Sequence, residues 1–141
     1  MRGITEAIAI LGATVVLAGA TADAHHSAAM FDMNKCRTLA GTVRTFQFQF
    51  PHSWLWVVVP GSKGGTDIWA LESAAPAQMS EIDVRWRRDV VQKGDRVTVM
   101  FSPMRDGRTG GALAKLTLPN GTVLRAATPA CAKELAPPTP Q

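Results

Sequence analysis

Residues 38–59, TLAGTVRTFQFQFPHSWLWVVV, have the pattern of two β-strands separated by a turn. Apolar residues alternate in one phase over 39–43 and in the opposite phase over 46–50. Such a change of phase within one strand predicts a β-bulge near Arg44–Thr45, which would bend the strand. Pro51-His52-Ser53 then interrupts the run and separates the two strands.

The remaining chain adds further strands and one short helix. Trp54–Val59 is apolar on both faces, which is typical of a buried strand. Ser73 is the expected cap of a short helix with Pro76 in its first turn, and Met79 and Ile82 supply its apolar contacts. The other expected strands are 66–72, 96–101, 112–118 and a short return at 122–124. This order predicts an all-β fold with one short helix, a small five-stranded OB-like barrel, with an open β-sandwich as the alternative.

The N-terminus has the organisation of a signal peptide. Met1-Arg2 is positively charged, residues 7–20 are small or apolar, and Ala22 and Ala24 are the small residues that precede a cleavage site. We expect cleavage after Ala24, so that His25 begins a mature protein in the periplasm or outside the cell. The apolar segment is shorter than the roughly 20 residues of a bilayer span, so we expect no membrane span after cleavage.

Cys36 and Cys131 are the only cysteines. In an exported protein an even number of cysteines indicates a disulfide, which would close a loop around nearly the whole domain. The loop-entropy model gives about 4–5 kcal/mol for a loop of roughly 100 residues. A pair of copper or zinc thiolates is the alternative, which the absence of a C-x-x-C spacing disfavours. The expected organisation is a signal peptide (1–24), an N-terminal arm (25–37), a barrel domain (38–131) and a disordered proline-rich tail (132–141).

Two groups of side chains are candidate ligand contacts. Trp54 and Trp56 share one side of their strand, and an exposed pair of indoles would mark a binding face, although packing in the core is the alternative. OB barrels bind oligosaccharides or oligonucleotides by stacking on such a face. The second group can hold phosphate or carboxylate groups, unless it is only a solvated face. It consists of Arg85, Trp86, Arg105 and Arg108.

The three histidines are candidate metal ligands. His25, as the mature N-terminus, can chelate a metal ion through its α-amine and imidazole, and His26 adds a second ring. His52 can approach them if the arm folds over that end of the barrel. Nitrogen ligands favour Cu(II), and the thioether of Met30 suits Cu(I). The alternative is that these residues are polar positions beside a cleavage site and in a turn.

The order of several short motifs resembles a bacterial family of small exported proteins of unknown function. The matching segments are 25–32 (HHSAAMFD), 51–54 (PHSW), 69–72 (WALE), 94–99 (GDRVTV) and 118–121 (LPNG). This sequence departs from the family pattern at Phe50, where asparagine is usual, and at Arg85, where a Gly-Trp pair is usual. The resemblance implies an exported OB-like barrel and implies no reaction.

The sequence gives little support to catalysis. It has no tyrosine, nucleophile elbow, phosphate loop or H-E-x-x-H motif. Asp67 and Glu72 lie an odd number of residues apart on one strand, so they do not form a local carboxylate pair. We therefore expect a monomeric binding or accessory module rather than an enzyme, with copper binding as the alternative. The net charge of +4 suits an anionic ligand or a periplasmic protein as partner, and the exported location disfavours nucleic acid.

Overall fold

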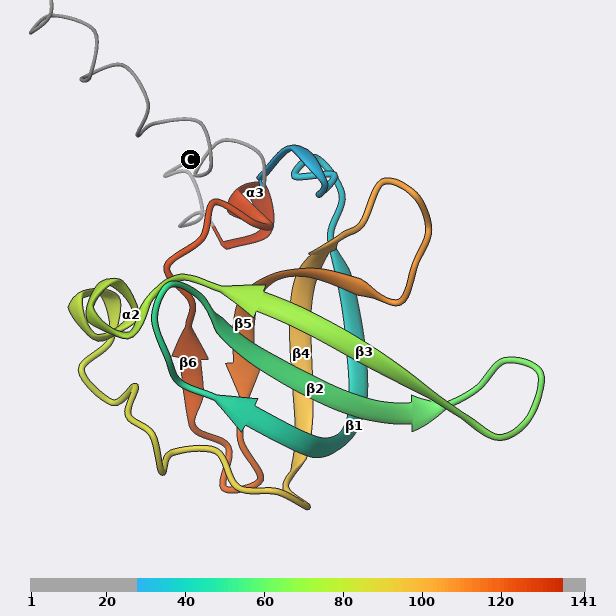
Figure 1. The fold of residues 1–141 in the computed structure, drawn as a ribbon, viewed down its shortest axis with the longest axis horizontal. Helices are drawn as coiled ribbons and strands as arrows, with labels where there is room; N and C mark the ends of the chain where they lie inside the picture. The colour runs from blue at the N-terminus through green and yellow to red at the C-terminus, as the bar shows by residue number, and fades with distance from the viewer. Residues whose placement is uncertain (1–27, 136–141) are drawn as a thin grey trace, which may run out of the picture.

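The computed structural model describes residues 28–135 of the chain and consists of a small β-barrel with an arm folded against one end (Figure 1). Its elements are β1 (Arg37–Gln47), β2 (Ser53–Pro60), β3 (Thr66–Ser73), α2 (Pro76–Ile82), β4 (Arg96–Pro103), β5 (Gly110–Thr117), β6 (Val123–Arg125) and α3 (Ala132–Leu135). The strand order is β3-β2-β1-β4-β5-β6, and a parallel pairing of β3 with β5 closes the first five strands into a barrel. The predicted OB-like barrel is confirmed.

The bend in β1 allows one strand to take part in both halves of the barrel. Residues Arg37 to Thr42 pair with β4, whereas Thr42 to Gln47 pair with β2. The register of the pairing with β2 shifts between Val43 and Thr45, as the change of hydrophobic phase predicts. The bulge therefore lies in the part of β1 where its pairing passes from β4 to β2.

The barrel interior is filled by alternate residues of each strand. Leu55, Val57 and Val59 of β2 point inward and are buried, but Trp54 and Trp56 point outward and are half-buried. The expectation that this strand is buried on both faces is therefore wrong. The other inward residues include Val43, Trp69, Leu71, Val97, Val99, Phe101, Leu113 and Leu116.

The short helix begins later than the sequence suggests. Ala75 is its N-cap, Pro76 occupies its first turn and Gln78 accepts a hydrogen bond from the Ala75 backbone N–H, so Ser73 ends β3 instead of capping the helix. Met79 is fully buried as expected, but Ile82 is 57% exposed. Ile82 is the last residue of the helix, at the end from which the chain continues toward β4.

The arm is attached to the barrel by backbone hydrogen bonds and by the disulfide. Asp32 N–H donates to Pro103 O at 2.8 Å, and Arg105 N–H donates to Met30 O at 2.9 Å. Cys36 and Cys131 form the expected disulfide, with their Cα atoms 5.2 Å apart. The arm and α3 consequently lie together at one end of the barrel (Figure 1).

A second, smaller apolar cluster forms beneath the arm. Phe31 is 4% exposed and lies with three alanines and Cys131 in this cluster.

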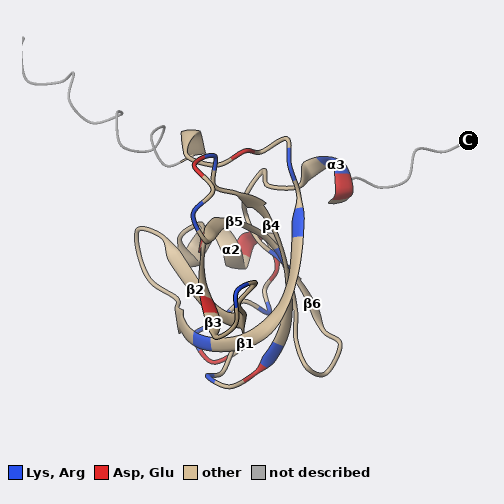
Figure 2. Cartoon of the chain, turned by 90° about the vertical axis from the view of Figure 1, so that its right-hand side faces the viewer, with Lys and Arg blue, Asp and Glu red and all other residues tan. Residues whose placement is uncertain are grey.

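Residues 132–135, where we expected disorder to begin, form one helical turn, and the rest of that tail lies outside the described residues. Within residues 28–135 no helix has the length and hydropathy to cross a bilayer. Figure 2 shows Lys and Arg interspersed with Asp and Glu rather than gathered into one patch.

Candidate functional site

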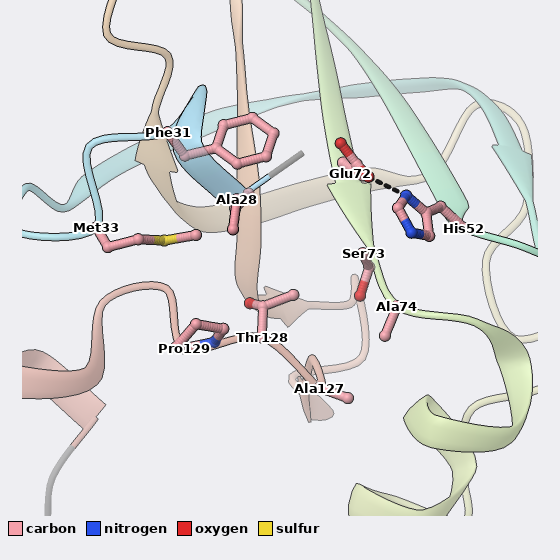
Figure 3. A pocket seen from close by; sticks show the side chains of 11 residues that line it. Ala28, Phe31, Met33, His52, Glu72, Ser73, Ala74, Ala127, Thr128 and Pro129 are labelled. Atoms are coloured by element: carbon pink, nitrogen blue, oxygen red, sulfur yellow. Dashed lines mark ion pairs between the residues drawn. The ribbon is translucent and has the colours of Figure 1, made fainter. Parts of the chain in front are cut away.

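A pocket of about 150 Å³ lies at the end of the barrel that the arm covers (Figure 3). Ala28, Phe31 and Met33 line it from the arm, His52 and Glu72 line it from the sheet, and residues 127–129 line it from the segment after β6. Most of this lining is apolar, so the two ionisable side chains are the groups in it that can carry charge.

The disulfide fastens two of the pocket walls to each other. Met33 lies just before Cys36 in the arm, and Pro129 lies just before Cys131 in the C-terminal segment. The bond therefore joins segments from opposite ends of the domain directly beside the pocket. The shape of the pocket depends on this covalent link as well as on the barrel.

His52 and Glu72 meet because β2 and β3 are paired in register. Glu72 lies opposite Trp54, which directs both side chains to the outer face of the sheet, and His52 lies two residues before Trp54. Nδ1 of His52 contacts Oε1 of Glu72 (Figure 3). Glu72 is only 6% exposed, and a buried carboxylate needs such a partner.

This contact determines which ring nitrogen of His52 is available. A hydrogen bond from Nδ1–H to the Glu72 carboxylate fixes the tautomer in which Nε2 carries the lone pair. The side chain of His52 is 38% exposed, so the ring is open to a ligand from the pocket side. The arrangement of carboxylate and imidazole is the one that orients metal-binding histidines in proteins.

Two buried hydroxyls lie beside this pair without a hydrogen-bond partner in the described part of the chain. They belong to Ser53 and Ser73, which pair across β2 and β3. Ser73 also lines the pocket (Figure 3). Buried polar groups are normally satisfied, so the Ser73 hydroxyl is a polar group at the wall of the pocket that lacks a described partner.

The predicted metal ligands are only partly brought together. His52 lies in the pocket, and Met33 of the arm lies there too, whereas Met30 is 40% exposed and lines a neighbouring pocket with Trp54. His25 and His26 lie outside the described residues. The one group of three potential metal-binding side chains that residues 28–135 place within ligating distance of each other includes Cys36 and Cys131. Their sulfurs are joined in the disulfide and are not thiolate ligands.

Trp86 is part of the core and not a ligand contact. It is 2% exposed, its ring lies 5.9 Å from that of Phe46, and its Nε1–H donates to Arg125 O at 2.6 Å. The prediction that Trp86 joins the arginines in holding a phosphate or carboxylate group is therefore corrected. The large ring of Trp86 packs into the end of the barrel, although its neighbours in the sequence are arginines.

The predicted arginines do not converge on one site. Arg85 binds Asp83 and Val123 O, beside the end of β5 where Thr117 pairs with Val123. Arg105 and Arg108 belong to the loop before β5, at its opposite end. There Arg105 Nε–H donates to Ala29 O, whereas Arg108 binds Asp106.

Local hydrogen bonds also explain two shifted carboxyl groups. The Arg85 side chain holds the pKa of the Asp83 carboxyl below its ordinary value. The backbone N–H of Arg108, followed by its side chain, lowers the pKa of the Asp106 carboxyl in the same direction. Both arginines are thus engaged with neighbouring carboxylates.

A family model described as "Family of unknown function (DUF6152)" matches residues 13–114. The chain belongs to this family. No curated protein and no solved structure matches it. The expected membership of an uncharacterised family is thereby confirmed, while the DUF6152 match carries no activity with it.

The range shared with DUF6152 includes His52 and Glu72 and ends within β5, before Cys131. Sequence reasoning considered Glu72 only as a partner for Asp67 and missed its contact with His52. The signal was present in the spacing, because His52 directly precedes β2 and lies two residues before Trp54. It becomes informative only when the β2–β3 register places Glu72 opposite Trp54.

Proposed function

We propose that this protein is a copper-binding module of the cell envelope, exported and cleaved after Ala24, and that it binds its metal without catalysing a reaction. One observation carries the proposal. His52, held by Glu72, lines a pocket that Ala28, three residues after His25 in the sequence, also lines. The disulfide and the absence of a spanning helix in residues 28–135 are compatible with export.

The chain length between these residues supports a shared site. A residue spans at most about 3.6 Å of extended chain, so the Cα atom of His26 lies within about 7 Å of that of Ala28. The Cα atom of His25 lies within about 11 Å by the same limit. Ala28 and His52 line the same pocket, so the chain is long enough for His25 and His26 to contribute ligands to this site in the proposed arrangement.

The donor set suits copper. Cleavage after Ala24 would give His25 a free α-amine, with an ordinary pKa of about 7.7–8, next to its own imidazole. These two nitrogens, the ring of His26 and Nε2 of His52 form a nitrogen-rich set, and Cu(II) binds such sets most tightly among the common divalent ions. Glu72 orients His52, and the Met33 thioether at the same pocket is a ligand type that suits Cu(I).

The test is a Cu(II) titration of protein that begins at His25, with a chelating competitor to measure tight binding. We expect one Cu(II) per chain and nitrogen hyperfine coupling in its electron paramagnetic resonance spectrum. An alanine added before His25 and the His52→Ala variant should each weaken binding at least tenfold, whereas Gln49→Ala, an exposed change nearby, should not. Equal and weak binding by all four proteins contradicts the proposal.

A further inference from the structure

A second binding surface lies on the outer face of the sheet, on the other side of Phe31 from the His52 pocket. A row of residues crosses this face at right angles to the strands. Thr45 of β1 pairs with Trp56 of β2, and Trp56 pairs with Ala70 of β3. Ala70 in turn pairs with Gly110 of β5. Neighbouring strands are about 4.8 Å apart, so this row is about 14 Å long.

Two stacked indoles form the centre of the surface. The rings of Trp54 and Trp56 have centroids 5.8 Å apart and planes inclined by 27°. Both are half-buried, and Ala70 beside Trp56 is too small to cover them. Ile68 and Met30, on either side, are 38% and 40% exposed. The indoles therefore present apolar ring surface to solvent.

A pocket adjoins the indole pair on each side, and each pocket includes an arginine. On the β1 side, Trp56 shares a pocket of about 380 Å³ with Arg44, Thr45 and Gln47. On the β5 side, a pocket of about 610 Å³ has an apolar floor and a polar rim. It is lined by Trp54, Met30, Phe31, Ala70, Met104, Arg108 and Thr109 among others.

An arginine lies at each end of the surface, Arg44 at the β1 end and Arg108, paired with Asp106, at the β5 end. Arg44 and Arg108 are exposed, and the side chain of Arg108 is 70% accessible. Within the Arg108 side chain only Nε binds Asp106, so its terminal amino groups can reach a ligand. Guanidinium groups bind carboxylates in a bidentate manner. Thr45, Gln47 and Thr109 add neutral hydrogen-bonding groups along the same line.

We propose that this surface binds an acidic oligosaccharide across β1, β2, β3 and the loop before β5. Sugar rings have apolar faces that stack on indoles, hydroxyls that suit threonine and glutamine, and, in uronic acids, carboxylates that suit arginine. A peptide strand fits less well, because β2 is paired on both sides and β3 is paired with β2 and β5. The sheet therefore offers no backbone edge here for strand addition.

This inference does not depend on copper binding. Phe31 lines both the His52 pocket and the larger pocket beside Trp54, and it separates the two. His52 and Glu72 line only the first. Substitutions at Arg44 or Trp56 should therefore leave the copper titration unchanged, and substitutions at His52 should leave the oligosaccharide affinity unchanged.

Calorimetric titration of the mature protein with tetragalacturonate tests the proposal. The methyl ester of the same tetrasaccharide removes the charges and keeps the rings, and a four-residue oligothymidylate tests nucleic acid. We expect saturable binding of the acid, about tenfold weaker binding of the ester, and loss of about tenfold in affinity for Trp56→Leu. Trp56→Phe retains a ring and should recover most of the affinity, which separates stacking from misfolding.

Charge specificity is tested with two arginine variants. Arg44→Gln should weaken binding of the acid about fivefold and leave binding of the ester unaffected. Arg88→Gln, at an exposed arginine between α2 and β4, should change neither affinity. Equal losses for both arginine variants reduce the effect to net charge and overturn the proposal. Tighter binding of oligothymidylate than of tetragalacturonate also overturns it, as does no saturable binding of the acid at millimolar concentration.

Discussion

Nδ1 of His52 contacts the carboxylate of Glu72, a residue that is almost completely buried and comes from the neighbouring strand. The two side chains meet beneath the arm, in a pocket that β5 and the segment after β6 also line. A carboxylate in this position holds the imidazole in one tautomer and one orientation, so its effect on a ligand is exerted through His52.

Glu72→Gln should weaken Cu(II) binding about 10-fold to 100-fold, the range typical of groups that orient a metal-binding histidine. The amide keeps the size of the side chain but has no negative charge, so it accepts a weaker hydrogen bond from Nδ1 and can also present its NH₂ group to the ring. Competitive Cu(II) titration measures the change. Glu81→Gln, an exposed carboxylate on α2, is the matched control and should bind as the unchanged protein does. An unaltered affinity for Glu72→Gln would remove Glu72 from the site.

Loss of the disulfide should affect both stability and the pocket. Replacing Cys36 and Cys131 by serine should lower the free energy of unfolding by about 2–5 kcal/mol, as measured by urea denaturation. Cu(II) affinity should fall as well, because the bond ties the Met33 wall to the Pro129 wall.

Reductant supplies the control for the disulfide prediction. Addition of reductant should move the unchanged protein toward the stability of the double variant and should leave the double variant as it is. If the double variant unfolds at the same urea concentration as the unchanged protein, the disulfide contributes no stability.

Trp86→Ala should be much more damaging to stability than Trp56→Ala. Truncation of a buried tryptophan costs about 3–5 kcal/mol, and here it also leaves Arg125 O without its donor. Trp56 is half-buried on the outer face, so its loss leaves no enclosed cavity. Thermal unfolding of the two variants gives the comparison. Similar losses for both would contradict the assignment of Trp86 to the core and Trp56 to a surface.

Stability should decrease in acid partly through Asp83. Its hydrogen bond to Arg85 lowers the pKa of the carboxyl in the folded protein. The contribution is complete above the ordinary carboxyl pKa of about 3.9 and is lost as the pH falls through the lower folded value. Asp83→Asn should therefore be less stable than the unchanged protein at pH 6, with a difference that shrinks below about pH 4. Urea denaturation at pH 6 and pH 3 measures it, and Asp89→Asn serves as the exposed control.

The architecture could be predicted because its signals are local. The change of hydrophobic phase at Arg44–Thr45 indicated the bulge, and the alternation in β4 indicated which residues face inward. The two cysteines in a chain with an apparent export signal indicated their bond. Each of these inferences needs only the neighbouring residues or a residue count.

The site was harder to predict because its contacts are not local. Glu72 reaches His52 only through the register of β2 with β3, which the sequence does not specify. Trp86 lies among arginines in a segment without helix or strand, so nothing nearby indicated that its ring fills the end of the barrel. The predicted arginine group is separated for a related reason. Arg85 lies beside one end of β5, and Arg105 and Arg108 lie at the other end.

The bridge between Phe31 and Met104 fixes the arm to the barrel at one point. The number of residues between the proposed cleavage site and Phe31 therefore limits how far the first amine can lie from the barrel. If the first amine of the mature chain is a ligand, a cut displaced by one residue moves that amine by one peptide unit relative to a fixed imidazole. The accuracy of the processing peptidase then becomes part of the assembly of the site, and proteins cut one position away would fold alike yet differ in metal affinity.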